Sequence, residues 1–244
     1  MSEQGHAKNL ENLTKARDFA AGWGAKYAPS NPLLSLTNLA TLIGNAANAS
    51  DDVQTARTPY RNATAAAEDG FAPLSKLVTR VMKALKVSGV PGSIVADADT
   101  YARKIRGRST SSGVKDDPAT PNVNESEKSH SASQMSRAQR VENLDSLILL
   151  LESNTLFAPN ENELKTATLN DLSAGLKAKM NAVQNTFVPF SNKLNARDGV
   201  FYTKGTGLAD VGKLFKGYVE SFGRDSAEWN QIKDLEFKEI KRKK

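Results

Sequence analysis

The stretch YAPSNPLLSLTNLATL at residues 27–42 decides the fold, because a related stretch, FAPNENELKTATLNDLSAGL, follows at residues 157–176. Each begins with an aromatic residue and Ala-Pro, and then shows apolar residues at helical spacing. The aromatic residue is expected to close one helix, and the proline prevents that helix from continuing. The two stretches are therefore predicted to be equivalent helix–helix corners in two copies of one unit.

Other landmarks recur in the same order on both sides of these corners. The first copy carries LENLTKARDF from Leu10, LTNLATLIGNAANA from Leu36, TPYRN from Thr58 and EDGF from Glu68. The second copy carries VENLDSLILL from Val141, LNDLSAGLKAKMNAV from Leu169, VPFSN from Val188 and RDGV from Arg197. An apolar series that starts at Leu77 returns with the same spacing from Leu214. A shared order over roughly a hundred residues predicts an internal duplication.

A segment rich in Ser, Thr and Asn separates the two copies. It has few large apolar residues, so it buries too little surface to offset the entropy lost on ordering, and it is interpreted as a linker. The predicted organisation is a disordered start at 1–7, a helical repeat unit at 8–107, a flexible linker at 108–136, and a second repeat unit with a basic tail at 137–244.

Apolar residues follow helical periodicity in both copies, which predicts an all-α protein. The expected architecture is two tandem homologous helical bundles of about four helices each, joined by the linker. The second helix of each copy is expected to span about 30 residues. It contains Pro59 or Pro189, which predicts a kink or a break at one structural position. Tyr60 and Phe190, the aromatic residues that follow, are expected to fill the inside of the bend.

Several residues are predicted to mark helix ends. Asn31-Pro32 is expected to be an N-cap with proline in the first turn, and Asn160 with Glu163 resembles a capping box. The glycines of EDG at 68–70 and RDG at 197–199 are expected to terminate helices. Last short helices are predicted at about 93–106 and 226–242, as the apolar spacing indicates.

Composition excludes several classes of protein. The 244 residues are 39% hydrophobic and include no apolar run long enough to span a membrane. The polar start MSEQGHAKNLENL has no apolar core of a secretory signal. The chain has no cysteine, which excludes disulfides, thiolate catalysis and Cys-ligated zinc. These features together predict a cytoplasmic protein.

No set of residues predicts a catalytic, cofactor-binding or metal site. GLADVGKL from Gly207 resembles a phosphate-binding loop, but Leu214 occupies the place of the required Ser or Thr. Its Lys-Leu pair also matches Lys76-Leu77 on an expected helix. The two histidines, His6 and His130, both lie in segments predicted to be disordered. Paired carboxylates such as Asp51-Asp52 lack the spacing of a metal loop and are interpreted as caps and turns.

Basic residues gather at two predicted helix ends, YARKIRGR and FKEIKRKK, in a chain of net charge +6. Such residues can contact phosphates, but they also stabilise helix C-termini, and the second interpretation is preferred. Aromatic residues do not interleave with the arginines as they do on a base-stacking surface. The candidate nucleic-acid contacts are Arg103, Lys104, Arg106, Arg108, Lys241, Arg242, Lys243 and Lys244.

The sequence therefore favours a non-catalytic intracellular interaction or structural protein, which binds protein partners or itself through helical faces. The first alternative is a nucleic-acid-associated protein that uses the basic helix ends. The second is an enzyme of unknown type, which a deep pocket with perturbed titratable groups would support. The dependence of binding on salt distinguishes the interaction protein from the nucleic-acid-associated protein, because phosphate binding weakens steeply with ionic strength and apolar packing does not.

Overall fold

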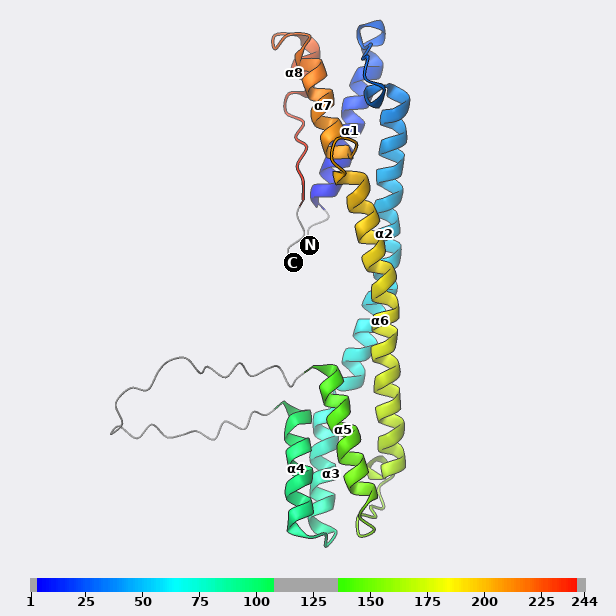
Figure 1. Cartoon of the computed structure of the whole chain (residues 1–244), viewed down its shortest axis with the longest axis vertical. Helices are drawn as coiled ribbons and strands as arrows, with labels where there is room; N and C mark the ends of the chain where they lie inside the picture. The colour runs from blue at the N-terminus through cyan, green and yellow to red at the C-terminus, as the bar shows by residue number, and fades with distance from the viewer. Residues whose placement is uncertain (1–3, 108–135, 241–244) are drawn as a thin grey trace, which may run out of the picture. The chain divides into compact units, whose positions relative to one another are not determined.

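The computed structural model describes residues 4–107 and 136–240, and all regular secondary structure in these ranges is helical (Figure 1). The prediction of an all-α protein is confirmed. The α-helices are α1 (Gln4–Gly22), α2 (Leu36–Phe71), α3 (Leu74–Val87), α4 (Gly92–Arg106), α5 (Arg137–Glu152), α6 (Thr166–Tyr202), α7 (Leu208–Glu220) and α8 (Ala227–Ile232). Short 3-10 helices are η1 (Gly24–Lys26), η2 (Pro32–Leu34) and η3 (Asn162–Leu164).

The chain forms two compact units, whose boundaries fall inside the two longest helices. Unit 1 combines residues 1–60 with 186–244, and unit 2 consists of residues 61–185. Helix α2 has 36 residues and is therefore about 54 Å long, so its two ends can pack into different cores. Contacts thus group the chain differently from the predicted repeat units 8–107 and 137–244, because each of these contributes to both compact units.

Unit 2 is built on helices α3, α4 and α5, which lie together in Figure 1. Their apolar faces meet in one core, joined by Phe157, by Leu164 of η3 and by Leu169 near the start of α6. Helix α4 ends at Gly107, whose φ of 70° closes the helix in the left-handed region that favours glycine. Ser136 is the N-cap of helix α5, and its side chain accepts a hydrogen bond from the Gln139 backbone N–H at 3.2 Å.

Unit 1 has its own core between α1, α7, α8 and the parts of α2 and α6 that belong to it. An aromatic cluster around Tyr27 lies in this core and includes Trp23, Phe215 and Tyr218. After α8 the chain becomes extended, and residues 235–240, which we call the strap, run beside α1 (red in Figure 1). The predicted helix at 226–242 therefore ends at Ile232.

The two halves of the chain repeat the same order of elements. From α1 to α4 and again from α5 to α8, a first helix is followed by a 3-10 segment, a long helix and two shorter helices; the 3-10 segment is η1 with η2 in the first half and η3 alone in the second. Buried Leu34 and Leu39 take the same places after the first corner as Leu164 and Leu169 take after the second. The sequence comparison, which placed Leu36 opposite Leu169, is therefore three residues out of register at this point.

Three predicted helix signals are wrong. Gly70 and Gly199 lie inside α2 and α6 and do not end them. At Gly70 an added Cβ would meet the side chains of Lys179 and Leu176. Asn160 and Glu163 form no capping box, since η3 has Glu161 at its N-cap without a side-chain bond. In contrast, Asn31 does cap η2, accepting a hydrogen bond from Leu33 at 3.0 Å.

The predicted disorder of residues 1–7 is also wrong for the part that the structure describes. Helix α1 already begins at Gln4, and His6 is buried. Burial follows from packing against α6, where the ring of His6 meets the ring of Phe201 edge to face at 5.2 Å. His130 and most of the predicted linker lie outside the described residues.

None of the described helices combines the length and the apolar character needed to cross a membrane.

Candidate interaction surfaces

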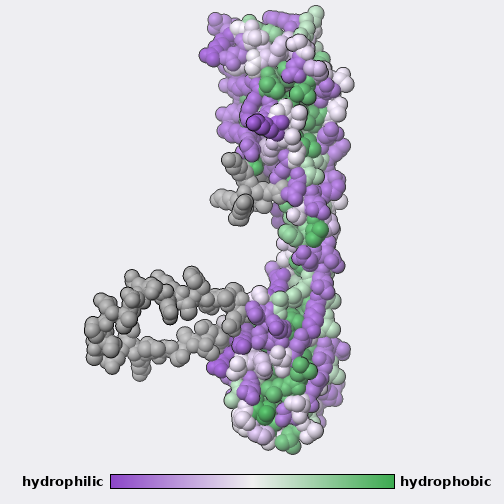
Figure 2. Space-filling view, in the orientation of Figure 1, coloured by the Kyte–Doolittle hydropathy of each residue, from purple (hydrophilic) through white to green (hydrophobic). Residues whose placement is uncertain are grey.

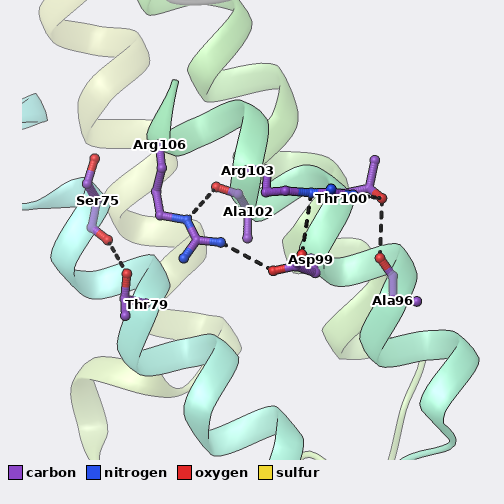
Figure 3. A network of polar contacts seen from close by, with 8 residues as sticks. All are labelled: Ser75, Thr79, Ala96, Asp99, Thr100, Ala102, Arg103 and Arg106. Atoms are coloured by element: carbon purple, nitrogen blue, oxygen red, sulfur yellow. Dashed lines mark hydrogen bonds and ion pairs between the residues drawn. The ribbon is translucent and has the colours of Figure 1, made fainter. Parts of the chain in front are cut away.

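Two arginines at the basic end of α4 share one carboxylate of their own helix (Figure 3). Asp99 accepts contacts from Arg106 at 3.3 Å and from Arg103 at 3.4 Å. Arg106 also donates to the Ala102 carbonyl at 3.0 Å, and its side chain is only 14% exposed. Arg106 is thus engaged in structural contacts, whereas the Arg103 side chain is 41% exposed.

Lys104 lies on another face of α4, beside a shallow pocket of about 470 Å³ in unit 2. The pocket also includes Asp97 and the strongly exposed Leu149, so its charge is mixed. Arg108, Lys241, Arg242, Lys243 and Lys244, the other predicted contacts, lie outside the described residues.

The four predicted kink residues are a proline and the following aromatic residue in each of the two long helices, α2 and α6. Pro59 and Pro189 both lie inside helices that continue past them, so neither helix breaks. Tyr60 and Phe190 stack on each other, with ring centroids 5.4 Å apart and planes within 13°. Phe187 joins them at 5.5 Å from Tyr60. The aromatic residues therefore connect α2 to α6, and this pairing across two helices is something the sequence did not predict.

Each unit has an apolar pocket built from equivalent elements. In unit 2 the pocket lies between α3 and the start of α6, with Leu77 and Leu172 in its lining, and measures about 380 Å³. In unit 1 it lies between α7 and η2, with Leu34 and Leu214 in its lining, and measures about 610 Å³. The Lys-Leu pair that the sequence comparison matched thus occupies the same place in both pockets.

The two pockets differ at their rims. In unit 2, Arg80 of α3 forms an ion pair with Glu163 of η3, and both residues line the pocket. Counted along the sequence from the matched Lys-Leu pairs and the aromatic-Ala-Pro corners, Gly217 corresponds to Arg80 and Leu33 to Glu163, and neither residue carries a charge that could form such a bridge. Leu214 in unit 1 is 43% exposed. The unit 1 pocket is therefore larger, and its rim lacks the ion pair.

One charged pair borders the unit 1 pocket. Asp210 accepts hydrogen bonds from the Gly205 backbone N–H at 3.0 Å and from Lys213 at 3.1 Å. The Gly205 N–H, followed by Lys213, holds the pKa of the Asp210 carboxyl below its usual range. A carboxylate held ionised in this way is a weak proton acceptor.

A buried polar network in unit 1 involves residues that sequence reasoning missed. Arg197, which is 2% exposed, donates to Asp198 at 3.1 Å. His6 approaches the same carboxylate at 3.7 Å and is covered by the rings of Phe201 and Tyr202. Because His6 is 5% exposed, a substrate has little access to this pair, and the network is interpreted as structural.

The described residues contain no group of three or more His, Cys, Asp or Glu side chains that could hold a metal ion. Comparisons with protein families, curated proteins and solved structures yielded no match to this chain.

Proposed function

We propose that the protein is a non-catalytic interaction protein that binds a protein partner or a second copy of itself through a helical face of unit 1. The observation that carries this proposal is the open apolar pocket between α7 and η2, with the exposed Leu214 in its lining. An exposed apolar side chain in a concave site gains the most from burial by a partner. In Figure 2, green apolar surface lies among hydrophilic residues over unit 1.

The comparison with unit 2 supports the choice of this pocket. The Arg80–Glu163 ion pair occupies the rim of the unit 2 pocket, whereas Gly217 leaves the corresponding place open. We also propose that the chain is a tandem duplication, as the repeated order of elements supports, with a linker between the copies. In this proposal the two pockets descend from one ancestral surface, and only the unit 1 copy keeps a binding role.

Site-specific photo-cross-linking in the native cell tests the proposed function. A p-benzoylphenylalanine at position 214 is expected to give defined adducts, with a protein partner or with a second copy. The control carries the same group at Val87, an 85% exposed residue of α3 that lines neither apolar pocket. Equal or absent adducts at positions 214 and 87 would contradict the proposal.

A double variant that introduces an ion pair at the rim of the unit 1 pocket tests the same surface and leaves the apolar core unchanged. Leu33→Glu with Gly217→Arg introduces the two residue types that form the ion pair in unit 2. No atom lies within 4 Å of an added Cβ at Gly217, so the new side chain has space. The cross-links at position 214 are expected to fall at least tenfold in yield, because the bridge closes the rim.

A further inference from the structure

Each compact unit joins the first half of one proposed copy to the second half of the other. In unit 1, α1 and η2 come from the first copy, whereas α7 and α8 come from the second. In unit 2 the order is reversed, because α3 and α4 come from the first copy and α5 and η3 from the second. The contacts of α1 with α7 and of α5 with α4 are therefore contacts between the two copies.

The two halves of one copy contribute to different cores. In the first copy, the buried apolar side chains from Leu13 to Ala46 belong to the core of unit 1, and those from Phe71 to Ile105 belong to the core of unit 2. The continuous helix α2 connects these two halves, and α6 connects the halves of the second copy in the same way. Each half of a copy therefore completes its core with residues of the other copy.

In unit 1 the small side chains lie on the first half and the large one on the second. Helix α1 contributes Ala16 and Ala20 to the core, and α7 contributes Phe215. All three are at most 1% exposed, and the Phe215 ring lies 5.7 Å from the ring of Tyr27. Small residues on one helix and a large residue on the facing helix together fill a core at native density.

In unit 2 this distribution is reversed. Counted from the shared Glu-Asn-Leu motif, Leu147 and Leu151 of α5 correspond to the two alanines of α1. Counted from the matched Lys-Leu pairs, Val78 of α3 corresponds to Phe215. All three are buried in the core of unit 2, and α4, which packs on α5, adds the buried Ala98 and Ala102. The large side chains thus lie on the first half and the small ones on the second.

We infer that the two copies are a specific pair, in which the first half of each copy fits the second half of the other copy and not a second half of its own kind. Pairing of like copies would place Ala16 and Ala20 opposite Val78, which leaves a cavity, or Leu151 opposite Phe215, which overpacks the core. The apolar faces of the two cores, and not the covalent connection, then hold the copies together. The inference rests on the proposed duplication for the correspondence of positions, and it is independent of binding at the Leu214 pocket.

The full chain with a specific protease site inserted between Gly113 and Val114 tests the pairing. After cleavage, the two fragments are expected to remain one particle with a mass close to the 26.3 kDa of the intact chain. The cleaved protein is then unfolded in urea, refolded by dilution and measured by native mass spectrometry. The pair of unlike fragments should be at least tenfold more abundant than both pairs of like fragments together, whereas random pairing would give equal amounts. Fragments that separate on cleavage, or a random mixture of pairs, would overturn the inference.

If the cleaved chain does not refold, variants of the intact chain decide. Ala20→Leu introduces the residue type of position 151 and should lower the midpoint of thermal unfolding by about 5 °C, because it overpacks the core beside Phe215. Adding Phe215→Val, the residue type of position 78, should restore at least half of this loss. Ala21→Leu, at an exposed position of the same helix, is the control and should leave the midpoint unchanged. An unchanged midpoint in Ala20→Leu, or no restoration by Phe215→Val, would contradict the size matching. Neither experiment alters Leu214, so the photo-cross-links test the proposed function separately.

Discussion

Tyr27 and Phe157 show how one residue position serves two corners. Both follow the end of a helix, both are 7% exposed, and each belongs to the core of its own unit. Tyr27 has one extra feature, a hydroxyl that donates to the Leu34 carbonyl at 2.6 Å. The aromatic-Ala-Pro motif therefore has a structural role at both places, in which an aromatic ring anchors the corner to the core.

We expect Tyr27→Phe to lower the free energy of unfolding at pH 7 by about 1 kcal/mol, because a buried hydrogen bond is lost. Burial, followed by Tyr218, raises the pKa of Tyr27 above its ordinary value of 10.0. The folded chain thus holds this proton more tightly than the unfolded chain, and the unaltered protein loses stability as the pH rises above 10. Above pH 10 the difference in free energy of unfolding between the unaltered protein and the Tyr27→Phe variant should therefore become smaller. Urea unfolding at pH 7 and above pH 10 measures it, and a difference that stays constant would contradict the assignment.

At the scale of elements, the long helices determine how the chain divides. Helices α2 and α6 each carry an internal proline, and the aromatic residues that follow the two prolines stack on each other. Proline removes one backbone hydrogen bond and crowds the preceding turn, so a helix keeps it only where packing compensates. The stack of Tyr60 on Phe190 places a contact between α2 and α6 directly after both prolines.

Pro189→Ala is expected to stiffen α6. Alanine restores a backbone N–H and removes the crowding, which should raise the free energy of unfolding by about 1–3 kcal/mol and slow amide exchange near position 189. Pro29→Ala is the control, because Pro29 lies outside the helices, and its replacement should be slightly destabilising instead. Unchanged stability and exchange in the Pro189 variant would show that the proline imposes nothing on α6.

For the whole molecule, the charges at the basic end of α4 are only partly offset by carboxylates of the same helix. Arg103 and Arg106 share Asp99, and Lys104 lines a pocket together with Asp97. Apolar contact at the unit 1 pocket does not depend on such charges. Binding through that pocket should therefore persist at high ionic strength.

Size-exclusion chromatography with light scattering and absorbance at two wavelengths measures this directly, on untagged protein from lysate without added nuclease. We expect a protein-like absorbance ratio and the same mass at low and at high salt. The mass should equal one 26.3 kDa chain or a small multiple of it. A strong 260 nm signal at low salt that disappears at high salt would instead favour the nucleic-acid alternative.

The sequence by itself determined the local features of this protein. Helical spacing of apolar residues predicts α1 to α7, because one face of a helix must be buried whatever it packs against. The aromatic-Ala-Pro corners and the Asn31 cap could also be predicted, since they depend on neighbouring residues alone. The helical setting of Lys213-Leu214 followed from the same periodicity.

Only the tertiary structure decided which distant residues meet. The division of α2 and α6 between two cores, the burial of His6 and the stack of Tyr60 on Phe190 join parts of the chain that no local pattern relates. The strap is the clearest case, because KDLEFKEI resembles a helix in sequence. Asn9, Asn12 and Gly212 hold it extended instead. The side-chain amides of the two asparagines donate to its backbone carbonyls, and the ring of Phe237 lies against Gly212.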